Sequence, residues 1–265
     1  MDLELTGKRA IVTGGSRGIG LAIARTLAAE GADVALAARH KAALEAARAS
    51  LTTRASGEVL AVPADTSDDE SVRAMVAEVV AGLGGVDILV NAAARPNTGA
   101  AVGLDAFSDG EFGEQINVKV LGYLRCIREV VPHMRAAGWG RIINISGLAA
   151  RGTGSITGTV RNVAVAAMTK NLADEFGRDG INVTVVHPGM TVTERTPGLI
   201  AALAEREGVD EDEARRRMAA PVSIGRLVTA DEVASVVAFL ASPKSTGING
   251  DAIAVGGGTL GPVYY

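Results

Sequence analysis

The sequence predicts an α/β protein built on one doubly wound parallel sheet of about seven strands, with helices on both faces. Short apolar runs alternate with amphipathic helical patterns along the whole 265-residue chain. The apolar runs are continuous rather than alternating, which is typical of strands buried on both faces. A glycine-rich turn follows the first run, at the place where a Rossmann-type sheet binds its ligand.

The expected strands are Arg9–Thr13, Val34–Ala38, Val59–Val62, Val86–Asn91, Arg141–Ser146, Val183–His187 and Ala252–Val255. Between them, apolar residues recur at helical spacing, as Ile19, Ile23 and Leu27 do. Longer helices are expected over residues 111–134 and 157–177. No internal repeat or linker interrupts the chain, so we expect one dinucleotide-binding domain over residues 1–265.

The charge-rich stretch from about residue 193 to 228 breaks this rhythm. It contains the pairs Glu211/Arg215, Asp212/Arg216 and Glu213/Arg217, whose i,i+4 spacing favours a solvated surface helix. Because insertions beyond the carboxyl ends of parallel strands border the ligand, the same stretch could form a lid.

Composition excludes several classes of partner. The net charge is −4, aromatic residues make up 3%, and no run of Lys or Arg occurs, which argues against nucleic acid and anionic membranes. The single Cys126 excludes an internal disulfide and fits a reducing compartment. With no signal peptide, membrane-length apolar run or metal-ligand cluster visible, we expect a cytoplasmic protein that binds a small molecule and no metal.

The glycine-rich turn carries the first functional signal. Gly14, Gly18 and Gly20 lie between the first expected strand and the first helix. They permit a tight turn, a close backbone approach to a pyrophosphate and close packing of helix on strand, respectively. The free N–H groups and dipole of the helix N-terminus then favour phosphate.

The chain resembles the short-chain dehydrogenase/reductase family. The resemblance rests on Thr13-Gly14-Gly15-Ser16-Arg17-Gly18-Ile19-Gly20, Asp65, Asn91-Ala92-Ala93-Ala94, Asn117, Ser146, Pro188-Gly189 with Thr193, and Gly256-Gly257-Gly258-Thr259. It spans nearly the whole chain. It implies a nicotinamide cofactor, with the pyrophosphate on the glycine turn, adenosine near Asp65 and Asn91, and nicotinamide beside Pro188, Gly189 and Thr193.

The end of the second strand indicates which nicotinamide cofactor is preferred. An acidic residue there would hold a ribose 2′-hydroxyl, but this strand ends Ala37-Ala38-Arg39. Arg39 and Arg17 suit a 2′-phosphate, so NADP(H) is preferred and NAD(H) remains possible. The residues expected to bind the cofactor are Gly14, Ser16, Arg17, Gly18, Ile19, Gly20, Arg39, Asp65, Thr66, Asn91, Ala92, Pro188, Gly189, Thr191 and Thr193.

The resemblance implies a catalytic Ser and Asn, matched by Ser146 and Asn117, together with a Tyr and a Lys four residues later. Counting back from the gapless stretch 164–170 places that pair at Gly158 and Asn162. The proton donor and its cationic partner are thus absent from their usual positions. A gap of one residue would pair Thr157 with Arg161 instead, but it requires a break inside a helix.

Other residues offer few substitutes for the proton donor. Tyr123 lies on the apolar stripe of its helix and is expected in the core, whereas Tyr264 and Tyr265 could act only from the end of a neighbouring subunit's chain. None of the lysines, Lys119 included, falls at the sequence position of Asn162. His187 is expected to be a packed strand residue.

Three functions remain open on these residues. The first is an NADP(H)-dependent oxidoreductase acting on a carbonyl or alcohol of a small to medium, largely apolar substrate. The second is a non-redox lyase, isomerase or dehydratase that reuses the pocket. The third is a catalytically silent subunit paired with an active relative. Family members assemble through the helices matching 111–134 and 157–177, which implies a homodimer or homotetramer.

Overall fold

The computed structural model describes residues 1–53, 55–95 and 103–260, and its main sheet has seven strands in the order β3-β2-β1-β4-β5-β6-β9. All neighbouring strands in it are parallel. The strands are β1 (Arg9–Thr13), β2 (Asp33–Ala38), β3 (Val59–Pro63), β4 (Ile88–Asn91), β5 (Gly140–Ile145), β6 (Ile181–Pro188) and β9 (Ala252–Val255). The predicted doubly wound parallel sheet is confirmed.

A second, two-stranded sheet pairs β7 (Thr191–Val192) with β8 (Val228–Thr229). Each strand has only two residues, too short for an apolar pattern, and the sequence did not predict them. This pairing joins the two ends of the charge-rich stretch, so that stretch leaves and re-enters the fold at one place.

The helices are α1 (Gly18–Ala29), α2 (Lys41–Thr52), α3 (Asp69–Leu83), α4 (Asp109–Ile116), α5 (Gly122–Ala137), α6 (Ile156–Phe176), α7 (Thr196–Glu207), α8 (Glu211–Ala219) and α9 (Ala230–Ala241). Short 3₁₀ turns lie at Leu104–Ala106, Leu148–Arg151, Gly177–Asp179 and Pro243–Ser245. The expected helix 111–134 is divided, because a π-helical turn over Asn117–Leu121 joins α4 to α5.

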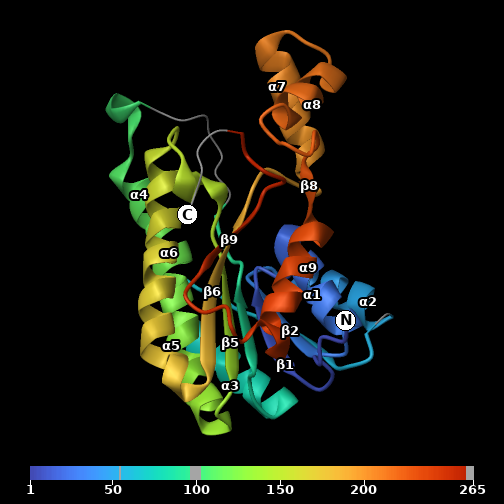
Figure 1. Ribbon diagram of the computed structural model, residues 1–265, viewed down its shortest axis with the longest axis vertical. Coiled ribbons are helices and arrows are strands. Elements are labelled where there is room, and N and C mark those ends of the chain that lie inside the picture. The colour runs from blue at the N-terminus through green and yellow to red at the C-terminus, as the bar shows by residue number, and fades with distance from the viewer. Residues whose placement is uncertain (54, 96–102, 261–265) are drawn as a thin grey trace.

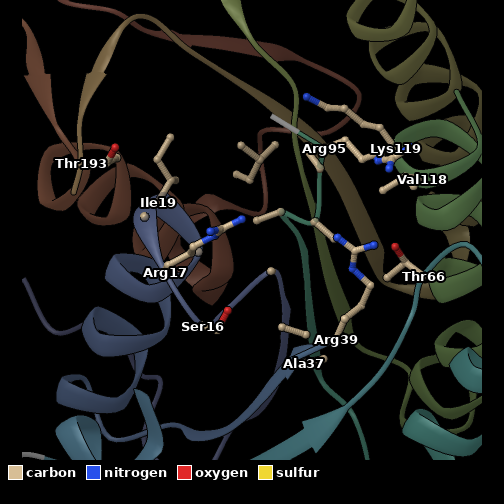
Figure 2. A pocket seen from close by; sticks show the side chains of 18 of the residues that line it. Ser16, Arg17, Ile19, Ala37, Arg39, Thr66, Arg95, Val118, Lys119 and Thr193 are labelled. Carbon is tan, nitrogen blue, oxygen red and sulfur yellow. The ribbon is translucent and has the colours of Figure 1, made fainter. Parts of the chain in front are cut away.

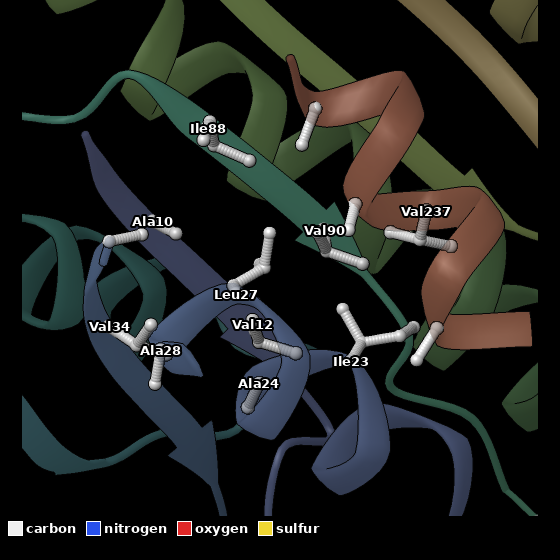
Figure 3. Close-up of a cluster of buried hydrophobic side chains, with 14 of the residues drawn as sticks. Ala10, Val12, Ile23, Ala24, Leu27, Ala28, Val34, Ile88, Val90 and Val237 are labelled. Carbon is white, nitrogen blue, oxygen red and sulfur yellow. The ribbon is translucent and has the colours of Figure 1, made fainter. Parts of the chain in front are cut away.

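Two helix layers cover the sheet (Figure 1). One buried cluster joins α1, α2 and α9 to the strands, and Figure 3 shows Ile23 and Leu27 of α1 with Val237 of α9 over Val12 and Val90. A second cluster joins α3, α5 and α6 to the other face. The strands are apolar throughout because both of their faces lie against helices.

The order of the strands fixes where a ligand can bind. From β1 the chain adds β2 and β3 on one side and β4, β5 and β6 on the other. The connections after β1 and β4 therefore diverge and leave a crevice beyond the carboxyl ends of these strands. The turn after Thr13 and the segment after Asn91 lie at this crevice, as the sequence predicted.

Helices α7 and α8 stand apart from the two main layers (Figure 1). Ile200, Ala204 and Ala214 form a small apolar cluster of their own between these helices. Of the three predicted ion pairs, the described residues contain Glu213–Arg217, and Glu213 also binds Arg216.

Within the described ranges, no helix combines the length and apolarity that a membrane crossing requires. Cys126 of α5 is buried in the second apolar cluster, and its burial raises the pKa of the thiol to about 12.

Candidate active site

The turn between β1 and α1 brings the backbone close to the segment after β4. Gly14 has φ of +70°, and a Cβ atom there would come within 2.9 Å of the Ala92 carbonyl group. A Cβ at Gly20 would lie 2.3 Å from the Gly14 oxygen. Thr13 Oγ1 accepts hydrogen bonds from the N–H groups of Ala92 and Ala93. Glycine is therefore required at both positions for β1, α1 and β4 to meet.

The N-terminus of α1 already holds a carboxylate in this structure. The N–H of Gly18 donates to Glu194 Oε2 at 3.2 Å. Neither a capping side chain nor an acidic first turn satisfies this helix end. Its free N–H groups and dipole favour an anion. The residues present therefore fit a cofactor pyrophosphate, which would take the place of Glu194.

Arg39 and Asp65 form the far end of the same pocket. Burial alone would raise the pKa of Asp65, but hydrogen bonds from Ser67 and the charges of Arg39 and Arg125 hold it below its usual value. Arg39 lies where β2 ends, and Figure 2 shows its side chain between Ala37 and Thr66. This end is polar and offers a guanidinium to any ligand bound there.

One pocket of about 530 Å³ connects these parts. Its wall includes the predicted residues Gly14, Ser16, Arg17, Gly18, Ile19, Gly20, Arg39, Asp65, Thr66, Ala92, Ser146, Gly189 and Thr193. In Figure 2, Ile19 and Thr193 lie on one side and Thr66, Val118 and Lys119 on the other. The glycine turn and Ser146 thus share one cavity, although 126 or more residues separate them in the sequence.

Six predicted site residues are not among the described residues that line this pocket: Asn91, Asn117, Gly158, Asn162, Pro188 and Thr191. The side chain of Asn91 is buried and donates to Asn144, so it joins β4 to β5. Thr191 pairs with Val228 and donates to the Gly189 oxygen. Asn117 begins the π-helical turn, and its carbonyl oxygen accepts from the Arg125 guanidinium.

Ser146, Asn162 and Lys119 form one buried hydrogen-bonded group. Ser146 Oγ donates to the backbone oxygen of Asn162 at 3.0 Å. Lys119 Nζ donates to the Ser146 backbone oxygen and to Asn162 Oδ1, both at 2.9 Å. The structure therefore brings Lys119 and Asn162 into direct contact, although Lys119 lies far from Asn162 in the sequence and was set aside on that ground.

The ammonium of Lys119 is poised to lose its proton near neutrality. Burial lowers the pKa of Lys119 to about 7, and the neighbouring charge of Arg161 acts in the same direction. A buried lysine of this kind can hold or release a proton at physiological pH. The π turn that carries it is a feature often found at functional sites.

Arg161 is the second buried cation on this wall. Its Nη1 donates to Gln115 Oε1 and to the Arg95 backbone oxygen, while its Nε has no partner in the described structure. Burial lowers the pKa of its guanidinium. Lys119 and Arg161 both border the pocket near Ser146, so this part of the wall is cationic, and the expectation of a largely apolar substrate stays a prediction.

Helix α6 runs without a break from Ile156 to Phe176, and the Ser155 hydroxyl accepts the N–H of Gly158 as its N-terminal cap. The gap that would pair Thr157 with Arg161 would fall inside this continuous helix. A Cβ at Gly158 would contact Ser155 Oγ at 3.1 Å.

The remaining candidate proton donors lie away from the pocket or outside the described residues. Tyr123 is fully buried in the core, as predicted, and donates to the Ile145 oxygen. Tyr264 and Tyr265 lie outside the described residues. His187 is buried on β6, and its burial, with the charges of Arg151 and Lys119, lowers its pKa to about 4.

Sequence reasoning missed two residues of this site, Lys119 and Glu194. A signal for Lys119 was present, because it stands three residues after Ile116 and four before Tyr123, on the apolar stripe of its helix. A charged residue on such a stripe is expected to be buried, and buried charged residues are rare. No local pattern marked Glu194, whose contact with Gly18 spans 176 residues.

Comparison with known proteins agrees with this architecture. The family described as enoyl-(acyl carrier protein) reductase matches residues 14–259. The short-chain reductase protein NovJ of Streptomyces niveus is 36% identical over 250 residues, which cover 94% of this chain and 92% of NovJ. The 3-oxoacyl-[acyl-carrier-protein] reductase FabG of Staphylococcus aureus is 34% identical over 257 residues, covering 95% of this chain and 97% of FabG.

Among solved structures, L-sorbose reductase from Gluconobacter frateurii, complexed with NADPH and L-sorbose, superimposes with a TM-score of 0.92. It is 33% identical, and the match covers 99% of this chain and 100% of that chain. With matches of this extent in sequence and in structure, the chain belongs to the short-chain dehydrogenase/reductase family.

Proposed function

We propose that this protein is an NADP(H)-dependent oxidoreductase that interconverts a carbonyl and an alcohol on a small to medium substrate. The observation that carries the proposal is one continuous pocket, which joins the turn at Gly14–Gly20 to the buried Ser146 and Lys119. A cofactor bound along the turn would end beside these groups. When bound, its nicotinamide supplies or accepts a hydride.

The preference for NADP(H) rests on charge at the end of β2. Arg17 and Arg39 line the pocket there, and no carboxylate follows Ala37 and Ala38 on the strand. A guanidinium binds a 2′-phosphate through paired hydrogen bonds, whereas a carboxylate would repel it. The NADPH complex of the sorbose reductase supports the same assignment.

The chain's own groups supply the polar chemistry at the other end. The Ser146 hydroxyl can donate to a substrate oxygen, because its present acceptor is a backbone carbonyl that it can exchange. Lys119 provides positive charge beside it, and Asn162 holds that ammonium. Gly158 stands at the start of α6, where the family resemblance places a tyrosine. This active site works without a tyrosine at that position.

We propose that the protein also assembles with a second copy of itself. Ile156, Val160 and Val163 of α6 are between 43% and 48% exposed and recur at i, i+4 and i+7. Such a stripe is an exposed apolar surface with no partner in the described part of the chain. The helices that carry and flank it match the segments 111–134 and 157–177 expected to associate.

The proposed function is tested by titrating the purified protein with NADPH and with NADH while following nicotinamide fluorescence. NADPH should bind more tightly. The Arg39→Asp variant should weaken NADPH binding by about tenfold or more and spare NADH, since a charge-assisted contact contributes about 1.5–3 kcal/mol. Equal loss for both nucleotides would exclude the assignment of Arg39.

Turnover is then measured as NADPH oxidation over a panel of ketones and oxo acids. Oxidation of any member above the rate without protein supports the oxidoreductase. Binding of neither nucleotide, with no turnover, would overturn it.

A further inference from the structure

Two buried cations lie in the wall of the pocket on the Ser146 side. Lys119, from the π turn, is only 4% exposed. Arg161, from α6, is only 8% exposed. Both border the pocket, and Figure 2 shows Lys119 across it from Ile19 and Thr193. They are therefore separated from the glycine turn that would bind a pyrophosphate.

Among the residues that the structure describes, the partners of these cations are all neutral. Lys119 donates to a backbone oxygen and to the amide of Asn162, which leaves one of its three N–H bonds without a partner in that part of the chain. Arg161 reaches the amide of Gln115 and the backbone of Arg95, and its Nε remains unpaired. In the ranges that the structure describes, no carboxylate pairs with either cation, since Glu114 is bound to Arg95.

Two like charges buried without a counter-ion are unfavourable, and each unpaired donor adds to the cost. This cost lowers the pKa of Lys119 to about 7, and loss of the Lys119 proton relieves part of it. An anion in the pocket would relieve it fully. It would pair with both cations, since both residues border the pocket.

We propose that Lys119 and Arg161 form a subsite for a carboxylate group of the substrate, which makes the substrate an oxo acid or the corresponding hydroxy acid. The guanidinium fork and the ammonium together suit the two oxygens of a carboxylate. Because Lys119 binds the backbone of Ser146, the carboxylate lies close to the carbonyl that reacts. This proposal rests on the proposed function, since it assigns the anion to the substrate of that reaction.

The first test measures binding without turnover. Phenylpyruvate and its methyl ester have the same skeleton and differ in charge, and each is titrated into the full-length protein by calorimetry. Phenylpyruvate should bind at least tenfold more tightly. Lys119→Met and Arg161→Met should each remove most of this preference, whereas Lys170→Met, an exposed lysine on α6, should keep it. Circular dichroism confirms that each variant is folded.

A second pair of measurements locates the anion. Arg17→Met alters the cofactor side of the pocket, so it should weaken NADPH and leave phenylpyruvate binding intact. Lys119→Met should do the reverse. If Arg17→Met abolishes phenylpyruvate binding and Lys119→Met does not, the carboxylate binds at the phosphate site and the proposal fails. If NADPH fails to bind but the charge preference persists, the proposed function fails and the anion subsite stands.

A third measurement follows the proton. The titratable and charged groups around Lys119 are Arg161 on α6, Tyr123 on α5 and His187 on β6. At pH 8, phenylpyruvate binding should take up about one proton, because the carboxylate restores the Lys119 ammonium. Calorimetry in two buffers of different ionisation enthalpy measures it. Lys119→Met should take up none, and an unchanged uptake in this variant would overturn the proposal.

Discussion

The side chain of Lys119 changes the interpretation of the active site at the scale of single residues. Counting along the sequence puts an amide, Asn162, where a cation is expected. In space, the Lys119 ammonium lies 2.9 Å from the oxygen of that amide. Positive charge is therefore present beside Ser146, supplied by the helix that faces α6 rather than by α6 itself.

Burial of Lys119 makes a prediction about stability and pH. The folded protein holds this proton with a pKa of about 7, and the unfolded chain holds it with the usual value of 10.5. Between these values the unfolded state binds more protons, so the free energy of unfolding should rise with pH. Urea denaturation from pH 7 to 10 should show wild type gaining stability relative to Lys119→Met. Lys170→Met should parallel wild type, and parallel curves for Lys119→Met would refute the buried ammonium.

At the scale of elements, the segment before α7 controls the N-terminus of α1. Glu194 lies two residues before the start of α7 at Thr196 and accepts the N–H of Gly18. A cofactor phosphate needs the same N–H groups. Cofactor and Glu194 therefore compete for one helix end, and binding of the first must move the second.

This competition predicts that the affinity for NADPH rises when the negative charge of Glu194 is removed. Glu194→Gln should bind NADPH about two- to fivefold more tightly, because an anion at a helix N-terminus contributes about 0.3–1 kcal/mol in the free protein. Glu205→Gln, an exposed acid on α7, is the matched control. Weaker NADPH binding by Glu194→Gln would show that Glu194 supports the bound cofactor instead.

The strands of the main sheet were largely predictable from the sequence, because a continuous apolar run indicates a strand that is buried on both faces. All seven strands of the main sheet lie within a few residues of their expected positions. The glycine turn was equally predictable, since Gly14 and Gly20 act through local backbone geometry. The contacts of Lys119 with Asn162 and of Glu194 with Gly18 were not predicted, because tertiary packing of distant helices creates them.

At the scale of the whole molecule, charge is unevenly distributed. The chain carries a net charge of −4. Yet basic side chains outnumber acidic ones on the pocket wall, with Arg17, Arg39, Arg95, Lys119, Arg161 and Arg195 against Asp65 and Glu194. A positive cleft in an acidic protein concentrates anionic ligands at one place and repels them elsewhere.

The exposed stripe on α6 predicts the state of assembly. Val160→Asp places a charge in the middle of the stripe and should shift the protein toward monomer in analytical ultracentrifugation, since an unpaired buried charge disfavours an apolar interface. Leu199→Asp, at an equally exposed apolar position on α7, should leave the mass unchanged. A monomeric wild type would remove this interface from consideration.

Because Cys126 is buried, the reactivity of its thiol reports how often the core becomes exposed. The thiol has no exposed surface, and a pKa of about 12 keeps it protonated and unreactive while the chain is folded. Because it is the one cysteine in the sequence, alkylation by iodoacetamide should proceed only through exposure of the core. The labelling rate, followed by mass spectrometry, should therefore fall when NADPH is added, and it should fall further as the NADPH concentration rises above its Kd.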